Sequence, residues 1–377
     1  MEQEIFDIDF IRKNAEKVSS GELESYTTSP LNSKQRLDIH NMTESFSNLC
    51  SLSLAVLGTK HKKVQIIRNG IEEKKPELTS EAIRFFSLYA RVPLPNCDPQ
   101  FLDYYLKGLD TYFDCLKFFS LFNRALAQMH FHELKSEATR VREEVIAYIK
   151  ANEEYSKFVG MKIEIPTGIM TKSKLYHQQH KNQWFVSIDV KSANYRVLRK
   201  FCPKLADTEW KEFISKFTKT EFLIESKYFK EVIFGELGHG KIMKLPLLFV
   251  DEVRKMVESD SNLIDTMEKV FCSEDEIVYK VDENFDVMSL EKSVESLLPG
   301  HFRVEKYKLS QIGQLSYFVR EFTFGKKDFK NIPKKFIMQC LKYYEHQQIT
   351  EIDRKFADED GMIATYDKDI FNNGKPF

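Results

Sequence analysis

Two short hydrophobic runs, each with an acidic residue at one end, hold the residues of this chain best suited to chemistry. The first runs from Trp184 to Asp189 and the second from Asp275 to Val281. Because a buried carboxylate is costly unless a cation compensates its charge, strands that bring Asp189 and Asp275 together indicate a divalent metal. A two-metal site needs at least two such carboxylates, and Glu276 is an assisting one. The pattern favours phosphoryl transfer with Mg²⁺.

The elements around these runs indicate a mixed fold. We expect strands over residues 162–166, 184–190, 277–281, 302–308 and 315–323. We expect helices over 33–49, 192–201, 207–219, 222–236, 245–258, 288–298 and 333–346, and several more between 78 and 157. A strand over 64–68 ends at an Asn-Gly turn signal. This order predicts an α+β fold with an antiparallel sheet.

Three segments resemble motifs of family A DNA polymerases and occur in that family's order. Residues 187–198, SIDVKSANYRVL, resemble the first palm motif, S-x-D-Y-S-Q-I-E-L-R-x-L. Residues 274–278, EDEIV, are similar to the palm motif H-D-E-x-x. Residues 227–235, KYFKEVIFG, resemble the fingers helix, in which a lysine four residues before a Phe-Gly binds the incoming triphosphate.

The resemblance implies a nucleotidyltransferase that adds nucleotides to a 3′-hydroxyl by a two-metal mechanism. Asp189 and Asp275 would bind the Mg²⁺ ions, and Lys230 would place a positive charge on the phosphates. Lys227 lies almost one helical turn earlier and can face the same triphosphate. Phe234 would form an apolar wall for the base or sugar. The implied partners are a nucleoside triphosphate and a primer-template or single-stranded nucleic acid.

The sequence departs from the family pattern at several positions. Asn194 replaces the glutamate that crowds the ribose 2′ position, which implies weaker discrimination against ribonucleotides. Gly238 or His239 stands where the family has a tyrosine, and Glu274 replaces a histidine. The stretch between the second and third motifs is shorter than in ordinary members, which implies reduced fingers.

A second resemblance lies near the N-terminus. Arg36 and His40 are one helical turn apart, so they share a helix face, and a basic strand with Lys62, Lys63 and Arg68 follows. This pattern is similar to the small single-strand nucleic-acid-binding domain named for its Arg-x-x-x-His signature. The resemblance implies that the arginine and histidine contact a phosphate or a base and that the basic strand extends the surface.

Composition limits the class of protein. The chain has 377 residues, 42% of them hydrophobic, and a formal net charge of −1, so we expect folded domains with regional binding surfaces. Six cysteines without CxxC spacing and a first segment unlike a signal peptide favour the cytosol or the nucleus. No apolar run approaches the length of a membrane span, so we expect no membrane partner.

Together these observations predict three parts. Residues 1–74 form a small α/β nucleic-acid-binding module, residues 75–157 a helical, thumb-like connector, and residues 158–377 a palm-like sheet with helical fingers and a C-terminal extension. The general texture also resembles uncharacterised proteins of large DNA viruses. The alternatives are a non-catalytic single-strand-binding protein on a degenerate palm, a nuclease with the same acidic pair, and strand-end aspartates bonded only to local amides. Lys230 disfavours the nuclease, because hydrolysis has no triphosphate to hold.

Overall fold

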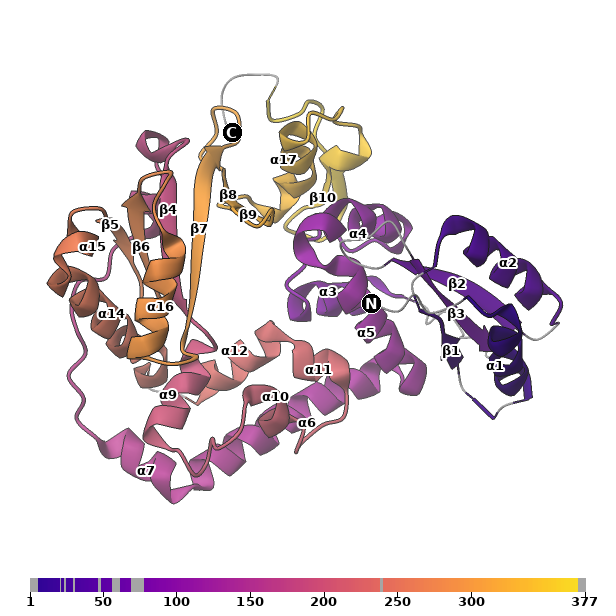
Figure 1. Ribbon diagram of the computed structural model, residues 1–377, viewed down its shortest axis with the longest axis horizontal. Helices are drawn as coiled ribbons and strands as arrows, with labels where there is room; N and C mark the ends of the chain where they lie inside the picture. Colours follow the sequence, from indigo (N-terminus) through magenta and orange to yellow (C-terminus); the bar gives the residue numbers. More distant parts are fainter. Residues whose placement is uncertain are drawn as a thin grey trace. The chain divides into compact units, whose positions relative to one another are not determined.

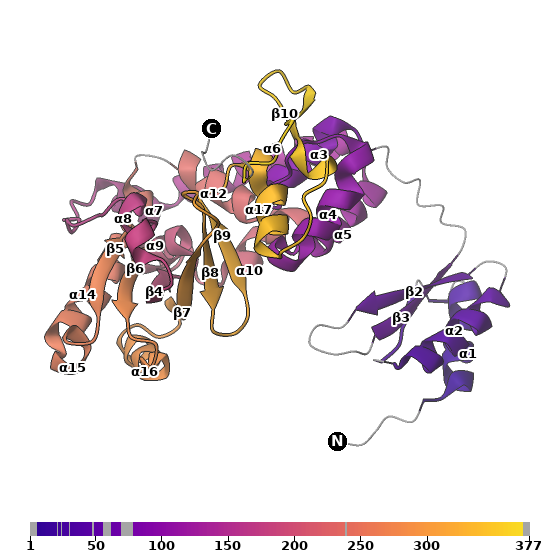
Figure 2. The ribbon, with the colours of Figure 1, turned by 90° about the horizontal axis from the view of Figure 1, so that it is seen from above.

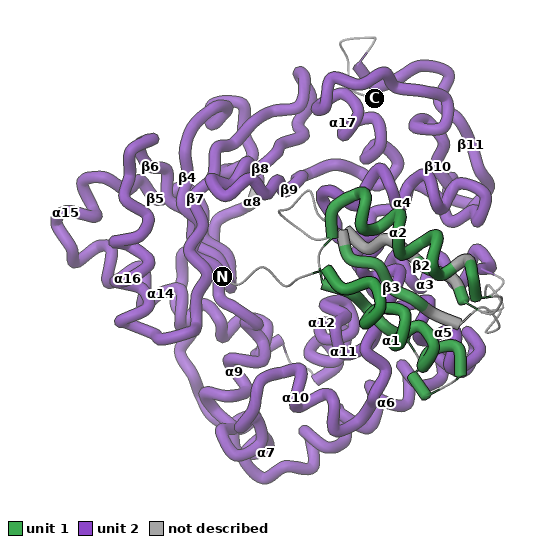
Figure 3. Tube along the Cα trace, turned by 45° about the vertical axis from the view of Figure 1, so that its right-hand side comes forward, with its two compact units in different colours: residues 1–77 green, residues 78–377 purple. Residues whose placement is uncertain are grey.

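The chain folds as two compact units, residues 1–77 and 78–377 (Figure 3). The computed structural model describes residues 6–20, 22–23, 25–29, 31–46, 49–55, 62–68, 78–237 and 240–371. The fold is α+β, as predicted. The predicted boundary at residue 157 does not divide unit 2, because one hydrophobic core joins the helices before it to the sheet and helices after it.

Unit 1 packs two helices against one face of an antiparallel sheet with strand order β1-β3-β2. Its elements are α1 (Ile8–Ser20), β1 (Ser25–Thr27), α2 (Ser33–Glu44), β2 (Leu49–Ala55) and β3 (Lys62–Arg68). α2 begins with a capping box in which Asn32 and Gln35 satisfy each other's backbone N–H groups. Helix α2 and strand β3 were predicted. Strands β1 and β2 were not predicted, and α1 contributes residues to the core of this unit.

A six-stranded antiparallel sheet organises unit 2, with strand order β5-β6-β4-β7-β8-β9 (Figure 1). The strands are β4 (Trp184–Val190), β5 (Glu268–Cys272), β6 (Glu276–Val281), β7 (Phe302–Gln311), β8 (Phe318–Phe322) and β9 (Lys327–Lys330). Strand β4, a set of helices, the β5–β6 hairpin, one helix and β7 follow each other as a β-α-β-β-α-β unit. The central strand and the adjacent hairpin therefore carry the two acidic segments.

Helices make up much of the rest of unit 2, and some of them pack on this sheet. They are α3 (Ser80–Tyr89), α4 (Pro99–Phe113), α5 (Cys115–Gln128), α6 (Phe131–Ala151), α7 (Glu153–Gly160), α8 (Lys172–Leu175), α9 (Ala193–Phe201), α10 (Trp210–Ile214), α11 (Glu221–Glu225), α12 (Lys227–Glu236), α13 (Lys241–Lys244), α14 (Leu247–Ser259), α15 (Ser261–Ile264), α16 (Val287–Leu297) and α17 (Ile337–Tyr344). α14 contacts β4 and β6, and α16 contacts β7 (Figure 2). α8 contacts β5.

Several predicted elements differ from the structure. Residues 162–166 form no strand; Ile163 and Ile165 pack on the core without a partner strand. The predicted helix over 207–219 shortens to α10. The predicted helix over 222–236 divides at Ser226, whose hydroxyl accepts from the N–H of Phe229 and donates to the carbonyl of Tyr89.

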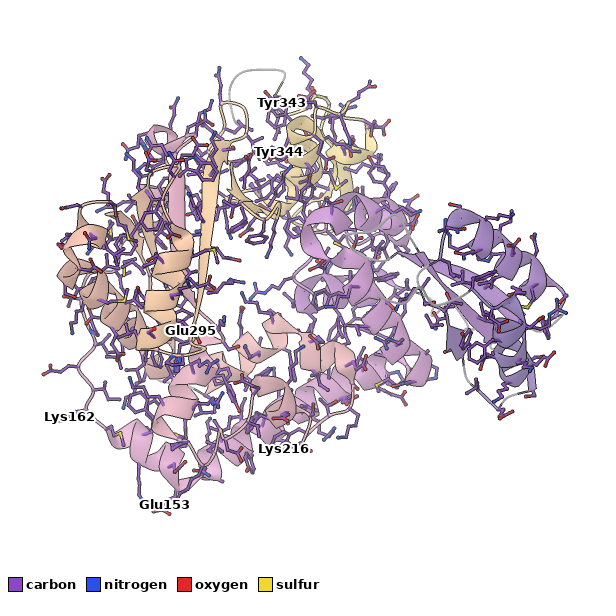
Figure 4. All side chains as sticks on the ribbon, in the orientation of Figure 1. Glu153, Lys162, Lys216, Glu295, Tyr343 and Tyr344 are labelled. Atoms are coloured by element: carbon purple, nitrogen blue, oxygen red, sulfur yellow. The ribbon has the colours of Figure 1, made fainter. Side chains whose placement is uncertain are left out.

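The C-terminal segment ties the sheet edge to the helical part of unit 2. Tyr344 on α17 donates to Glu321 of β8 at 2.8 Å, and its position is labelled in Figure 4. Asp353, fully buried, accepts a 2.6 Å hydrogen bond from Tyr104 of α4. Strands β10 (Lys355–Ala357) and β11 (Ile363–Thr365) form a small separate sheet here. The sheet, α3 to α5 and the segments that join them thus form one body.

Candidate active site

The candidate site lies at the end of β4, where two neighbouring segments hold the backbone. The N–H of Val190 donates to the carbonyl of Asp275 at 2.8 Å, and the N–H of Lys191 donates to that of His301 at 2.8 Å. In the strand register, Asp189 is opposite Glu276 on one side and opposite Arg303 on the other. Because directly opposed residues of antiparallel strands share a face, these three side chains project from the same face of the sheet.

A cavity of about 790 Å³ opens beside this strand end. It is lined by Asp189, Val190, Lys191, Ser192, Ala193, Asn194, Glu209, Trp210, Lys211, Ile224, Glu225, Ser226, Lys227, Lys230, Glu231, Met243, Pro246, Glu274, Asp275 and Arg303. The structure therefore brings together five of the residues singled out in the sequence, namely Asp189, Asp275, Asn194, Lys227 and Lys230. The strand, the hairpin turn and the helix α12 each supply part of the lining.

Asp189 is the carboxylate most affected by this environment. Its Oδ2 accepts a 2.9 Å bond from Nη2 of Arg303. Burial raises the pKa of Asp189 to about 6, the negative charges of Glu276 and Asp275 add to the rise, and the positive charges of Arg303 and Lys227 partly offset it. A carboxylate in this state gains from any additional cation, because the cation stabilises its charged form.

Glu276 does not act in the cavity, which corrects its predicted assisting role. Burial opposes its ionisation, but Arg320 and the hydroxyl of Ser187 outweigh burial and hold the pKa of Glu276 below its usual value. Arg320 donates to Glu276 at 2.7 Å and Ser187 donates to it at 2.6 Å. Glu276 does not line the cavity. Its hydrogen bonds with Ser187 and Arg320 link β6 to β4 and β8.

Two lysines of α12 bring positive charge to the cavity. Lys230 donates from Nζ to the Ser192 hydroxyl at 3.0 Å, and its Nζ lies 5.9 Å from the centre of the Trp210 ring. Burial and the nearby charge of Lys227 lower the pKa of Lys230 to about 8. Lys227 is exposed at the start of the helix. Ser192 adopts the left-handed conformation, φ 52°, at the start of α9, so the acceptor of Lys230 is built into the turn after β4.

Of the two residues predicted to contact the base or sugar, Asn194 lines the cavity and Phe234 does not. Phe234 is 1% exposed and packs against Tyr195 and Trp210, with ring centres 6.3 and 5.5 Å away. It is therefore a core residue and not the predicted wall of a nucleotide site; Trp210 is the aromatic ring that lines the cavity. Asn194 lines the cavity and donates to the sulfur of Met243 at 3.4 Å. Gly238 and His239 lie outside the described residues.

The oxygen donors of the cavity suit Mg²⁺ bound together with phosphates. No group of three His, Cys, Asp or Glu residues in the described part of the chain could hold a metal alone. Magnesium in nucleotide sites commonly takes one or two carboxylates, waters and substrate phosphates. Within the described residues, Oδ1 of Asp189 and Oδ2 of Asp275 accept no hydrogen bond, whereas Oδ1 of Asp275 accepts one from Ser273. Each aspartate thus keeps an oxygen for a cation.

Arg36 and His40, which were predicted to share a surface with the basic strand, each make hydrogen bonds within unit 1. Arg36 donates to the Leu31 carbonyl at 2.9 Å and to Ser33 at 3.1 Å, at the start of its own helix. Nδ1 of His40 lies 2.6 Å from the Ser51 hydroxyl, on the helix-covered side of the sheet.

Lys63 alternates with the buried residues of β3, so it projects from the opposite face. The predicted continuous surface is therefore wrong for this lysine. The side chains of Lys62 and Arg68 lie outside the described residues.

Sequence reasoning missed three contributors to the site, namely Arg303, Ser192 and Trp210. Arg303 belongs to a predicted strand, but its place opposite Asp189 depends on which strands are neighbours. Trp210 lies in a predicted helix with a plain helical pattern. Ser192 belongs to the first palm-like motif, and its link to Lys230 joins two of the three resembling segments.

Comparison of the chain with protein-family models, curated proteins and solved structures finds no match. None of the helices in the described ranges has the length and hydropathy needed to cross a membrane.

Proposed function

We propose that unit 2 binds a nucleoside triphosphate with Mg²⁺ in this cavity and transfers a nucleoside monophosphate to the 3′-hydroxyl of a nucleic acid. The observation that supports this proposal is that Asp189, Asp275, Lys227 and Lys230 line one cavity, although they come from three separate segments. A cavity lined by both carboxylate oxygens and ammonium groups suits a metal-bound polyphosphate.

Each residue has a distinct part in this proposal. Asp189 and Asp275 would hold Mg²⁺, which when bound neutralises phosphate charge and activates the attacking oxygen. Lys227 and Lys230 would hold the phosphates as point charges. A bound triphosphate would restore full protonation of Lys230, because a nearby negative charge favours the ammonium form. Asn194, a neutral amide, would lie near the sugar without the charge of a glutamate.

The test is incorporation of a labelled nucleotide into a primer, with DNA and RNA primers compared and Mg²⁺ present or absent. Asp189→Asn and Asp275→Asn should each reduce Mg²⁺-dependent incorporation at least about a hundredfold, as expected for loss of a group that acts on the transition state. Glu268→Gln removes a carboxylate of edge strand β5 whose ion-pair partner among the described residues is Lys280, so it is the matched control and should leave incorporation unchanged. Normal extension by either aspartate variant would contradict the proposal.

A non-catalytic single-strand-binding protein is the second candidate, and one observation favours it. Residues 326–335 carry five lysines and one aspartate, at and after the turn between β8 and β9. Lys330 pairs with Asp328, whereas Lys327 and Lys335 lie over aromatic rings. Lysines that contact rings and not carboxylates keep a positive charge that can bind the phosphates of a nucleic acid. A pure binder would give a salt-sensitive gel shift without Mg²⁺-dependent extension.

A further inference from the structure

Two arginine–carboxylate pairs lie close together on one face of the sheet and differ in burial. Arg320 and Glu276 have side chains 8% and 16% exposed, and two aromatic rings flank the guanidinium. Arg303 and Asp189 are 50% and 28% exposed, and both line the cavity. The first pair is buried, whereas the second is accessible to an ion or ligand that enters the cavity.

Arg303 also has a second carboxylate within reach. Its Nε forms an ion pair with Oε2 of Glu305 at 3.2 Å, while Nη2 donates a hydrogen bond to Asp189 at 2.9 Å. Glu305 lies two residues further along the same strand, so it shares the face of Arg303. If the guanidinium releases Asp189, Glu305 still holds it beside the cavity. Such an arrangement permits displacement without leaving an arginine unpaired.

We propose that Arg303 is an internal cation that occupies Asp189 until a divalent metal replaces it, and that Arg303 thereby lowers the metal affinity of the free site. The inference depends on the proposed function, because it assigns a metal to Asp189. A guanidinium and a metal ion compete for the same negative charge, so each weakens the binding of the other. Once displaced, Arg303 stays on the cavity wall, where its charge can meet a phosphate of a bound triphosphate.

Manganese binding, measured by electron paramagnetic resonance on the full chain without nucleotide, tests the inference independently of activity. The relevant quantity is the part of Mn²⁺ binding that Asp189→Asn abolishes. Arg303→Gln should tighten this binding by about two- to fivefold, a range that corresponds to a partly exposed ion pair. Arg303→Lys keeps the positive charge on a shorter side chain. Its Asp189-dependent Mn²⁺ affinity should lie between those of Arg303→Gln and the unaltered chain.

Lys211→Gln is the matched control, because Lys211 lines the same cavity but pairs with Glu225 at 2.6 Å. It removes one positive charge without freeing Asp189. If Lys211→Gln tightens Mn²⁺ binding as much as Arg303→Gln does, the effect is general electrostatics and the inference is wrong. If Arg303→Gln folds poorly, as judged by circular dichroism, the Arg303→Lys comparison decides.

The outcomes separate this inference from the proposed function. Asp189-dependent Mn²⁺ binding that is equal in the unaltered chain and in Arg303→Gln overturns the inference and leaves the metal site intact. Binding that is absent from the unaltered chain and appears in Arg303→Gln supports the inference strongly. Absence from both overturns the inference, which requires a metal at the free site, whereas primer extension, in which a triphosphate supplies further metal ligands, tests the proposed function separately.

Discussion

Lys230 combines burial with a charge that the negative charge of Glu209 offsets only in part. Its partner in the described residues is a hydroxyl, and burial lowers its pKa to about 8. A lysine placed this way costs folding free energy, since burial disfavours the ammonium form. A polyphosphate would supply the missing negative charge, so binding and protonation of Lys230 should be coupled.

Triphosphate affinity should therefore fall as the pH rises through about 8, the pKa of Lys230 in the free site. Below this pH the ammonium form predominates and binding needs no proton uptake; above it, binding must first protonate the lysine. Proton linkage predicts that triphosphate affinity falls roughly tenfold between pH 7 and pH 9. Fluorescence anisotropy of a labelled, non-hydrolysable triphosphate over this range would measure it.

Lys230→Arg is the informative control for this pH dependence, because a guanidinium keeps its charge throughout the range. It should bind with a flat profile, and Lys230→Met should bind weakly with a flat profile. A tenfold loss that persists in Lys230→Arg would show that another group titrates.

At the scale of elements, helix α12 has two faces with separate tasks. Phe229, Ile233 and Phe234 pack into the core, while Lys227 and Lys230 border the cavity. Phe234→Ala should destabilise unit 2 by about 3 kcal/mol, because it leaves a void between Tyr195 and Trp210. Urea unfolding monitored by circular dichroism would measure the change.

The matched variant on the same helix is Lys227→Ala. Its side chain is exposed, so the free energy of unfolding should change by less than about 0.5 kcal/mol. Triphosphate affinity should nevertheless fall several-fold, because one phosphate-facing charge is lost. If Phe234→Ala instead weakened binding at unchanged stability, the nucleotide-wall role implied by the resemblance would be restored.

The sequence predicted the elements whose hydrophobic patterns are strong. Strands β4 and β6 were found from continuous apolar runs that are buried on both faces, and α14, α16 and β7 lie close to the predicted ranges. β9 was missed because only Phe329 of its four residues is buried. Residues 162–166 alternate like a strand, yet their apolar side chains pack on the core without a neighbouring strand.

The site was predictable where a charged residue stands in a recognisable segment. The two aspartates were chosen at the ends of apolar strands and the two lysines from the resemblance to a fingers helix, and all four line one cavity. The role predicted for Phe234 was wrong, because sequence alone does not distinguish an aromatic residue of the core from one that lines a binding site. Arg303 could not be found, because strand register, which sets its place opposite Asp189, is a property of the assembled sheet.

At the scale of the whole molecule, the two units have separate hydrophobic cores. The core of unit 1 consists of residues from α1, α2 and its own sheet, and the core of unit 2 begins after residue 77. Units that share no core can unfold separately. This separation lets each proposed binding activity be assigned to one unit.

A fragment comprising residues 78–377 should therefore fold and bind triphosphate with the affinity of the full chain to within about twofold. Every residue that lines the cavity lies within this unit, so removal of residues 1–77 takes away none of these residues. Anisotropy titrations of both proteins with the same labelled triphosphate would compare them. A parallel titration of both proteins with a single-stranded oligonucleotide assigns the nucleic-acid contacts. Lower affinity of the fragment would assign them to unit 1, and equal affinity would assign them to unit 2. A fragment that folds but binds triphosphate much more weakly would mean that unit 1 takes part in the site.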